Sequence, residues 1–393
     1  MSDVPFQQMN AGLPALGDVM VAAAAAGGHA LDGEAHQAAA RLRLPEVRTW
    51  CVVVVDGLGW HNLAARPEYA PFLTATLAAQ ETPDSPRRRL AATLPSSTPT
   101  NLAYLGTGQR PGRTSMLGYT VRNPATGGLL NLISWNGGAD PHDWQPAQTV
   151  FERFAPDRRA AVSVGPWQFE GSGLTLAALR GAEYHPAQSL PERVDASLGA
   201  LRDPDVGLVY LYWGDLDAAG HRYGWRSAEW AEQLQHVDEH LRRLARLLPQ
   251  GTGMLITADH GMIDVPDGQL SGMQGRIDAG THPQLSRDVD LLGGEDRFRH
   301  VYTEYPEQVA RRWREVLGER ATVLTRQEAI QAGMFGPVTA QARPIIGDVI
   351  AAAQGQVAIQ DSVQQSPAAL ALRGMHGSTT ETEVEVPLAV VTG

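Results

Sequence analysis

Lysine is absent from this chain of 393 residues, because all 32 residues counted as lysine or arginine are arginine. The absence excludes sites that need a lysine amine, namely a Schiff base, a phosphate-binding P-loop and a lysine general base. The 43 acidic residues leave a formal net charge of −11. An acidic surface is poorly suited to the backbone of DNA or RNA, so we expect no stable nucleic-acid partner.

Cysteine is almost absent as well. The single cysteine, Cys51, excludes an internal disulfide framework and a cysteine-based metal cluster. It lies within an apolar run, so we expect it to be a small buried core residue.

Long apolar stretches are also missing. No segment reaches the roughly 18 apolar residues that cross a bilayer, and the apolar run at residues 19–28 is too short. Residues 1–12 lack the basic and apolar regions of a signal peptide. These absences predict a cytoplasmic protein with no membrane partner.

Short apolar runs recur along the chain and end in polar residues or glycine. Continuous runs of this kind are typical of strands buried on both faces of a parallel sheet. Helical patterns lie between them, and the clearest spans residues 227–248 with Ser227 as its expected N-cap. This alternation predicts an α/β fold with a doubly wound, mostly parallel sheet. The predicted strands are Trp50–Val55, Ala160–Val164, Gly207–Trp213, Met254–Thr257 and Leu388–Val391.

Two regions fit the alternation less well. Residues 113–159 are rich in Gly, Pro, Asn and Trp, whereas residues 264–370 mix loops with helix-like and strand-like pieces. We interpret both as insertions into a single domain that spans residues 1–393. Residues 264–370 are expected to form a small inserted α+β subdomain or cap.

Carboxylates and histidines follow the predicted strands. In doubly wound sheets, ligands bind outside the carboxyl ends of the strands. Each residue alone could be a helix cap or a packed histidine. Together, three carboxylates and three imidazoles suit Zn²⁺ or a similar divalent ion, and they suffice for two sites of three ligands, as in two-metal phosphoryl transfer. The six residues are Asp56, Asp217, His221, Asp259, His260 and His376.

A second pattern lies at residues 94–102. Pro99 precedes a helix-compatible stretch, which indicates a proline at the first helical position and makes Thr98 the N-cap. A hydroxyl there lies at the positive end of a helix, where anions bind. From this segment alone, a cap with no further role is the favoured interpretation.

Five motifs together resemble the alkaline phosphatase superfamily, and within it the type I phosphodiesterase/nucleotide pyrophosphatase family. They are VVVDGLG at 53–59, LPSSTPTN at 94–101, DAAGH at 217–221, ADHGM at 258–262 and MHG at 375–377, in the order of the family. The chain differs from eukaryotic ecto-enzymes of the family at Pro99 and Thr100 and lacks their disulfide-rich domains. It therefore looks like a compact bacterial member with the fold of alkaline phosphatase.

The resemblance implies a role for each site residue. Thr98 would be the nucleophile, and Asn101 would steady a non-bridging phosphoryl oxygen. The implied cofactors are two divalent ions, with Zn²⁺ expected. One would be held by Asp56, Asp259 and His260 together with the Thr98 oxygen, and the other by Asp217, His221 and His376.

The function inferred from these features is hydrolysis of a phosphodiester or a nucleotide pyrophosphate through a phosphothreonine intermediate, on a small-molecule phosphate ester or nucleotide. A phosphomonoesterase or a phosphonoacetate-type hydrolase is the alternative. The absence of lysine, and of arginine in the nucleophile segment, favours the diester. A non-catalytic, metal-stabilised binding protein is disfavoured, since none of the implied site residues is missing. The oligomeric state is left open.

Two further groups of residues receive an interpretation from the sequence. Five aromatic residues flank the motifs, where ordinary packing is expected ahead of substrate stacking; they are Trp60, Tyr104, Tyr119, Trp135 and Trp213. Arg297, Arg299 and His300 form a local basic cluster, which we interpret first as solvated surface and second as a substrate contact.

Overall fold

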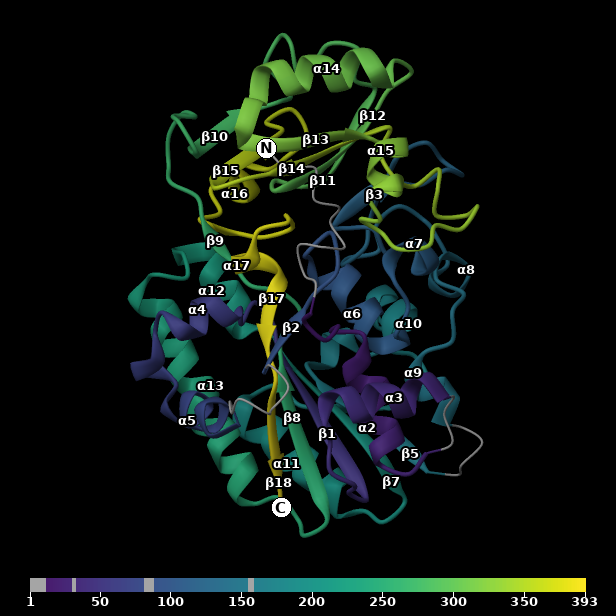
Figure 1. Cartoon of the computed structure of the whole chain (residues 1–393), viewed down its shortest axis with the longest axis vertical. Helices are drawn as coiled ribbons and strands as arrows, with labels where there is room; N and C mark the ends of the chain where they lie inside the picture. Colours follow the sequence, from purple (N-terminus) through teal and green to yellow (C-terminus); the bar gives the residue numbers. More distant parts are fainter. Residues whose placement is uncertain (1–11, 30–32, 81–87, 155–158) are drawn as a thin grey trace.

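The central feature is a six-stranded sheet in the lower part of the molecule (Figure 1). A computed structural model describes residues 12–29, 33–80, 88–154 and 159–393. Most of the N-terminal segment used to exclude a signal peptide, residues 1–11, lies outside these ranges. The strands, in sheet order, are β18 (Ala389–Thr392), β8 (Thr252–Thr257), β1 (Thr49–Val55), β7 (Val206–Trp213), β5 (Ala160–Gly165) and β6 (Glu183–Pro186).

The sheet confirms the predicted fold class. Strands β8, β1, β7, β5 and β6 run parallel, and only the edge strand β18 is antiparallel to its neighbour β8. All five predicted strands are present. Strand β6 was not predicted because its four residues, EYHP, are partly exposed at the sheet edge and form no apolar run. In register, Val55 pairs with Trp213 and Val54 with Thr257, so the residues after β1, β7 and β8 meet at one edge.

Helices cover both faces of the sheet. One face packs against α2 (Asp18–Ala26), α6 (Thr98–Thr107) and α9 (Val150–Phe154). The other face packs against α5 (Pro71–Gln80), α11 (Leu190–Arg202) and α13 (Ala228–Arg246). The predicted cap of α13 is confirmed, because the Ser227 hydroxyl accepts a hydrogen bond from the Trp230 N–H at 3.1 Å.

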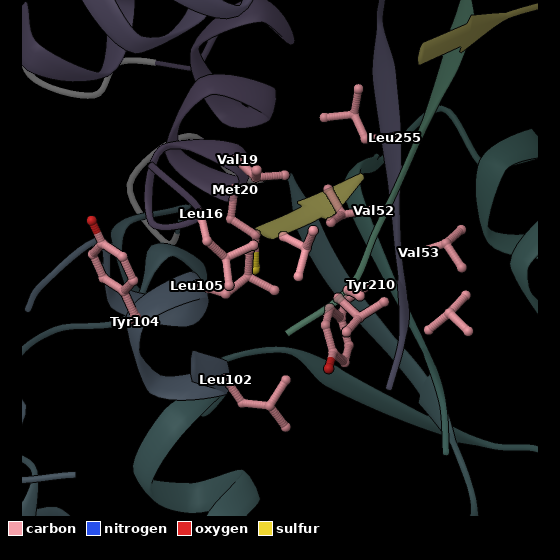
Figure 2. Close-up of a cluster of buried hydrophobic side chains, with 14 of the residues drawn as sticks. Leu16, Val19, Met20, Val52, Val53, Leu102, Tyr104, Leu105, Tyr210 and Leu255 are labelled. Carbon is pink, nitrogen blue, oxygen red and sulfur yellow. The ribbon is translucent and has the colours of Figure 1, made fainter. Parts of the chain in front are cut away.

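The hydrophobic core lies between these layers. Figure 2 shows side chains of α2 and α6, among them Met20 and Leu105, beside Val52 of β1 and Tyr210 of β7. Cys51 is fully buried in this core, and burial raises the pKa of its thiol to about 12. The predicted role of Cys51 as an inert core residue is confirmed.

A second sheet forms most of the inserted region. Its four antiparallel strands, in sheet order, are β11 (Leu291–Glu295), β12 (Phe298–Tyr302), β14 (Val349–Ala353) and β13 (Ala321–Thr325). Helix α14 (Pro306–Leu317) packs on β13 and β14, with Trp313 fully buried between them. These elements form an α+β region in the part of the chain where an insertion was predicted, and the bounds 264–370 stay a prediction. Its status as a separate cap on one catalytic domain stays a prediction.

The prediction that Arg297, Arg299 and His300 form a solvated surface is wrong. Their exposed fractions are 0%, 3% and 0%. The hairpin of β11 and β12 turns these polar side chains inward, where they bind buried carboxylates and backbone carbonyls instead of water. The local sequence gave little sign of this, because most of the partners are distant in sequence, such as Glu383 for Arg297, although Asp296 is only three residues from Arg299.

The region 113–159, interpreted as an insertion, contains a small hairpin and short helices. In the described part of the chain, no helix is long and apolar enough to cross a membrane. The other helices are α3 (Gly33–Leu42), α4 (Trp60–Ala64), α7 (Pro111–Thr114), α8 (Pro141–Trp144), α10 (Gly173–Ala178), α12 (Asp215–Tyr223), α15 (Arg326–Gln331), α16 (Pro367–Leu370) and α17 (Glu381–Val384), with 3₁₀ turns η1 (Pro67–Tyr69), η3 (Trp167–Phe169) and η4 (Gly318–Arg320). The other strands are β2 (Arg89–Ala91), β3 (Thr120–Arg122), β4 (Leu129–Asn131), β9 (Ile263–Asp264), β10 (Gln274–Asp278), β15 (Gln356–Gln360), β16 (Gly374–Met375) and β17 (Glu385–Pro387).

Candidate active site

The carboxyl edge of the central sheet brings the six predicted ligand residues together. Asp56 follows β1, and Asp259 and His260 follow β8. Asp217 and His221 lie four residues apart on α12, so one helical turn presents both to the same point. The Asp217 Oδ2 atom lies 3.3 Å from the His221 Nε2 atom. His376, directly after β16, completes the cluster, with its Nε2 atom 3.3 Å from that of His221.

Within this cluster, two groups of three residues have ligand atoms within 4.8 Å of one another. The first group is Asp217, His221 and His376, as implied by the family resemblance. The second is Asp56, Asp217 and His260, so Asp217 lies between the two groups. Asp259 was the expected third member of the second group, and its Oδ2 atom lies 3.5 Å from His260 Nε2.

Gly57 allows this close approach. Its φ of +75° is one that side chains rarely adopt, and an added Cβ would lie 3.1 Å from the Asp217 side chain. The sharp turn after β1 therefore brings Asp56 and Asp217 to the same point without a clash.

Thr98 lies beside the second group. Its hydroxyl oxygen is 3.1 Å from His260 Nε2 and 3.5 Å from both carboxylate oxygens of Asp56. The side chain is nearly buried at the start of α6. The predicted N-cap position is off by one residue, because Ser97 is the extended cap and Thr98 opens the helix. Thr98 still lies at the positive end of the helix dipole.

The three imidazoles are oriented in the same way. The Nδ1 atom of His221 pairs with the carbonyl of Gly374 at 2.8 Å, and that of His376 pairs with the carbonyl of Ser96 at 2.8 Å. The Nδ1 atom of His260 pairs with the carbonyl of Gly261 at 3.1 Å. Each Nδ1 therefore donates its proton to a carbonyl, so that the lone pair of Nε2 is the one available to a metal ion. Metal-binding histidines are commonly held in this tautomer and orientation.

The electrostatics of the cluster call for a cation. Burial raises the pKa of Asp217 to about 6, and burial together with the charge of Asp56 raises that of Asp259 well above its usual range. Burial lowers the pKa of His260, but the carboxylates of Asp259 and Asp56 outweigh it and raise the value to about 10. These shifts express the cost of placing three carboxylates in a buried site.

Two buried carboxylate oxygens in the cluster lack a hydrogen-bond partner, namely Asp217 Oδ1 and Asp259 Oδ2. Buried polar atoms are rarely left in this state. Oxygen and imidazole donors of this kind fit divalent ions such as Zn²⁺. The residues therefore fit the pair of metal ions that the family resemblance implies.

Asn101, the residue implied to contact a phosphoryl oxygen, makes backbone contacts in this structure. Its side chain is fully buried, and its carbonyl oxygen accepts a hydrogen bond from the Thr93 N–H at 2.8 Å. Its amide nitrogen lies 3.3–3.4 Å from the carbonyls of Thr93, Pro95 and Ser97. In this structure the amide therefore binds the backbone of the segment before Thr98. Its implied contact with a phosphoryl oxygen stays a prediction.

Tyr212 is a site residue that the sequence reasoning missed. Its hydroxyl donates a hydrogen bond to the Oδ2 atom of Asp56. Tyr210 and Tyr212 alternate along β7 and both line a cavity beside Thr98. The sequence does contain a signal for both tyrosines. They lie two residues apart in a predicted strand, so their side chains share one face of it, and that strand ends shortly before Asp217.

Two cavities meet at Thr98 and Asp217. The first, of about 400 Å³, is here called the apolar cavity. The second, of about 570 Å³ and walled partly by the inserted region, is called the polar cavity. The apolar cavity is lined by residues including Leu102, Val164, Phe169, Leu174, Tyr184, Tyr210 and Tyr212. The polar cavity is lined by residues including Tyr119, His221, Glu295, Asp296, Arg299, Asp361, Gln364, Gln365 and His376.

The aromatic residues singled out in the sequence fall mostly outside these cavities. Tyr119 lines the polar cavity and is 42% exposed. Trp213 and Tyr104 are buried in the core. Trp60 lies under the Arg89 guanidinium, and the Trp135 indole donates to the Ala139 carbonyl. Packing is therefore the role of these four, as expected.

Curated proteins resemble this chain over a limited segment. Ectonucleotide pyrophosphatase/phosphodiesterase family member 7 of Rattus norvegicus is 31% identical over 104 residues, 25% of this chain and 24% of the relative. Bis(5'-adenosyl)-triphosphatase ENPP4 of Bos taurus is 31% identical over 103 residues, 24% of this chain and 23% of the relative. The matched segment thus spans about a quarter of the length of these relatives.

Solved structures resemble the chain over most of its length. Murine ectonucleotide pyrophosphatase/phosphodiesterase 5 has a TM-score of 0.67 at 16% identity and covers 88% of each chain. Phosphonoacetate hydrolase from Sinorhizobium meliloti 1021, in complex with phosphonoformate, has a TM-score of 0.62 at 19% identity and covers 88% of this chain and 90% of the other. At these identities the likeness shows the fold alone.

The sequence model of the type I phosphodiesterase/nucleotide pyrophosphatase family matches residues 50–379. This range contains all five motifs and every predicted site residue. Since the match extends over most of the 393 residues, the chain belongs to the type I phosphodiesterase/nucleotide pyrophosphatase family, a family of metal-dependent phosphoric ester hydrolases.

Proposed function

We propose that this protein hydrolyses a phosphodiester or nucleotide pyrophosphate bond, with Thr98 as the nucleophile and two divalent ions as cofactors. One observation carries the proposal: the Thr98 hydroxyl lies 3.1 Å from His260 Nε2, where the two cavities meet. From this position the Thr98 hydroxyl could contact a phosphorus atom in either cavity. It could also contact a cation held by the cluster. No structural role of Thr98 requires that arrangement.

The cofactors we propose are two Zn²⁺ ions. Asp56, Asp259 and His260 would hold one beside Thr98, and Asp217, His221 and His376 would hold the other. When bound, the pair supplies Lewis-acid activation of the hydroxyl and charge stabilisation at the leaving oxygen. Support comes from the unpartnered oxygens of Asp217 and Asp259 and from the uniform orientation of the three imidazoles.

In the first step, the Thr98 oxygen forms a bond to phosphorus while the bond from phosphorus to the leaving oxygen breaks. The proton of Thr98 passes to solvent, and the leaving oxygen gains a proton from solvent. The positive end of α6 favours negative charge on the phosphoryl oxygens. Tyr212 donates to Asp56, which holds that carboxylate in place beside the nucleophile.

In the second step, water attacks the phosphothreonine from the side that the leaving group has vacated. The bond between phosphorus and the Thr98 oxygen breaks, and Thr98 recovers its proton. The burial of Thr98 protects the intermediate from uncontrolled access of water. The net reaction adds one water molecule across the ester bond.

The inserted region has a place in this scheme. The polar cavity is lined both by the segment around Thr98 and by residues 292–299 and 361–372. We propose that the chain acts as one catalytic domain in which residues 264–370 form a cap over the substrate.

We also propose a cytoplasmic location, which localisation of the protein in cells would test.

A substrate screen tests the function. Purified protein would be assayed with bis-p-nitrophenyl phosphate, p-nitrophenyl phosphate, a dinucleoside polyphosphate and phosphonoacetate, each with and without Zn²⁺. We expect the highest kcat/KM for the diester or the polyphosphate, and loss of activity on chelation. A strong preference for p-nitrophenyl phosphate or phosphonoacetate would favour the monoesterase or phosphonate alternative. If the protein hydrolysed none of the four substrates, the proposal would be overturned.

A further inference from the structure

We infer that the leaving group of the substrate occupies the polar cavity and carries no negative charge. The inference rests on the proposed function and narrows its substrate class to phosphodiesters of non-anionic alcohols or phenols. It disfavours nucleoside polyphosphates, in which the leaving group is itself a phosphate. Three features of the described residues carry it: the position of His221 and His376 in the wall of the polar cavity, the charges of the polar cavity and the charges of the apolar cavity.

The geometry assigns one arm of the substrate to each cavity. Thr98 lies beside His260 and Asp56, and an in-line displacement sends the leaving oxygen away from the nucleophile. The opposite group contains His221 and His376, which line the polar cavity and are absent from the lining of the apolar cavity. The leaving group therefore enters the polar cavity, and the retained group enters the apolar cavity.

The polar cavity has an acidic wall. Apart from the ligand residues, its charged lining consists of Glu295, Asp296, Asp361 and Arg299. Three carboxylates thus face one guanidinium. A phosphate in this cavity would meet more negative than positive charge.

Arg299 is already engaged and cannot reverse this balance. Its Nη2 atom donates to Asp296 Oδ1 at 2.7 Å and to the Gln365 side-chain oxygen at 3.0 Å. Its Nε atom donates to the carbonyl of Ile359 at 2.6 Å. Only 3% of the residue is exposed, and its charge is offset by Asp296.

Glu295 and Asp361 have no comparable cationic partner among the ion pairs of the described residues. Glu295 Oε1 accepts from the Tyr119 N–H at 3.0 Å, while its Oε2 atom is buried without a hydrogen-bond partner. Asp361 accepts from the Val363 N–H at 3.1 Å and from the Gln364 amide. The Asp361 carboxylate can accept hydrogen bonds from hydroxyl groups but repels a phosphate. Burial raises the pKa of Glu295 to about 7, so its carboxylate adds to this repulsion only near and above neutral pH.

Within the described ranges of the chain, no cationic side chain lines the apolar cavity either. Among its lining residues, Asp56 and Asp217 are the charged ones, and both belong to the metal cluster. The rest of the wall is aromatic, aliphatic or hydroxylated, apart from the neutral amide of Gln168. Neither cavity therefore supplies a cation for a second phosphate, and the substrate that fits best is a diester whose only negative charge is on the reacting phosphoryl group.

A charge-removal experiment tests the inference. The kcat/KM of the zinc-loaded enzyme would be compared for bis-p-nitrophenyl phosphate, with an uncharged leaving phenol, and ATP, with pyrophosphate as leaving group. We expect the wild-type ratio to favour the diester at least 100-fold. The variants Asp361→Asn and Glu295→Gln/Asp361→Asn should raise the ATP-to-diester ratio at least 3-fold and 10-fold. The two-site change matters because each carboxylate contributes separately.

Glu315→Gln/Glu319→Gln is the matched control. Both residues are exposed in and just after α14, and the change in net charge is the same. This control should leave the ratio unchanged, so a shift there would identify a global charge effect and contradict the inference. ATP hydrolysis as efficient as diester hydrolysis, or an unchanged ratio in both cavity variants, would also overturn it. Absence of hydrolysis of either substrate would instead count against the proposed function.

Discussion

Arg297 of the inserted region and Glu383 of α17 form a two-pronged ion pair in which both side chains are fully buried. The Nε and Nη2 atoms of Arg297 lie 2.8 and 2.7 Å from the two carboxylate oxygens of Glu383. Glu383 also accepts from the Ser378 N–H at 3.0 Å, and Ser96 Oγ donates to the Ser378 carbonyl at 2.7 Å. The pair thereby joins the inserted region to the loop of His376 and to the segment before Thr98.

Removing the charge of Glu383 should disturb both stability and metal binding. Glu383→Gln keeps the size of the side chain but leaves a buried, unpaired guanidinium, which costs about 3–5 kcal/mol. Because the same carboxylate holds the loop of His376, the affinity for Zn²⁺ should fall about tenfold or more. Urea unfolding of the zinc-loaded protein and chelator competition measure the two effects.

Asp348→Asn is the control for this variant. Asp348 pairs with Arg326 at 2.6 Å within the inserted region and is partly exposed. It should lose less stability and keep its affinity for Zn²⁺. Equal zinc affinity in Glu383→Gln and the wild type would show that the ion pair serves the fold alone.

Removal of the metal should destabilise the protein as well as inactivate it. A ligand present at 100 times its Kd stabilises the folded state by about 2.7 kcal/mol per site. Dialysis against a chelator should therefore lower the melting temperature, and two equivalents of Zn²⁺ should restore it together with activity. Asp217→Asn should reduce binding to fewer than two ions, because Asp217 belongs to both ligand groups. Full activity in a zinc-free preparation would refute a metal-dependent site.

Asn101 should act on the fold of the nucleophile segment. In Asn101→Ala, the Thr93 N–H loses its buried acceptor, which costs about 1–3 kcal/mol. The loss should be present in the metal-free protein without substrate, as measured by urea unfolding. A variant with full stability and a reduced kcat would instead support direct contact with the phosphoryl group.

His300 should contribute to the pH dependence of stability. Burial lowers the pKa of His300 from 6.5 to about 4, and the ring lies between the carbonyl of Leu117 and the N–H of Gly347. The unfolded chain binds a proton on this ring more tightly than the folded chain does. The contribution of the neutral His300 ring to the free energy of unfolding is therefore complete above pH ~6.5 and is lost as the pH falls towards ~4. Its size is on the order of 3 kcal/mol.

Urea unfolding between pH 7.5 and pH 5 should show this loss in the wild type. His300→Gln should have a shallower pH dependence over the same range. His236→Gln, at an exposed position of α13, should retain the wild-type slope. Identical slopes in His300→Gln and the wild type would contradict the assignment.

The parts of the structure that depend on local pattern could be predicted from the sequence. The apolar runs located five of the six central strands, and the rule that ligands bind at the carboxyl ends of strands placed Asp56, Asp217 and Asp259 at one edge. The helix at 227–248 and its Ser227 cap follow from periodicity and capping chemistry in the same way.

The parts that depend on distant contacts could not be predicted. Arg297 can be buried because it pairs with Glu383. The two residues are 86 positions apart in the sequence, and no local pattern indicates such a partner. The motif implies a phosphoryl contact for Asn101, which stays a prediction, but it gave no sign that the same side chain accepts a hydrogen bond from the Thr93 N–H. The inclusion of Asp217 in both ligand groups depends on the turn at Gly57 and on the packing of two strands.

The central claim is that Thr98 is the nucleophile at a site that holds two metal ions. The most direct measurement is the kcat of Thr98→Ala on bis-p-nitrophenyl phosphate, with zinc content determined on the same preparation. The account predicts at least a 1000-fold loss of kcat with close to two zinc ions retained and the melting temperature little changed. Hydrolysis by Thr98→Ala at a rate near that of the wild type would contradict it.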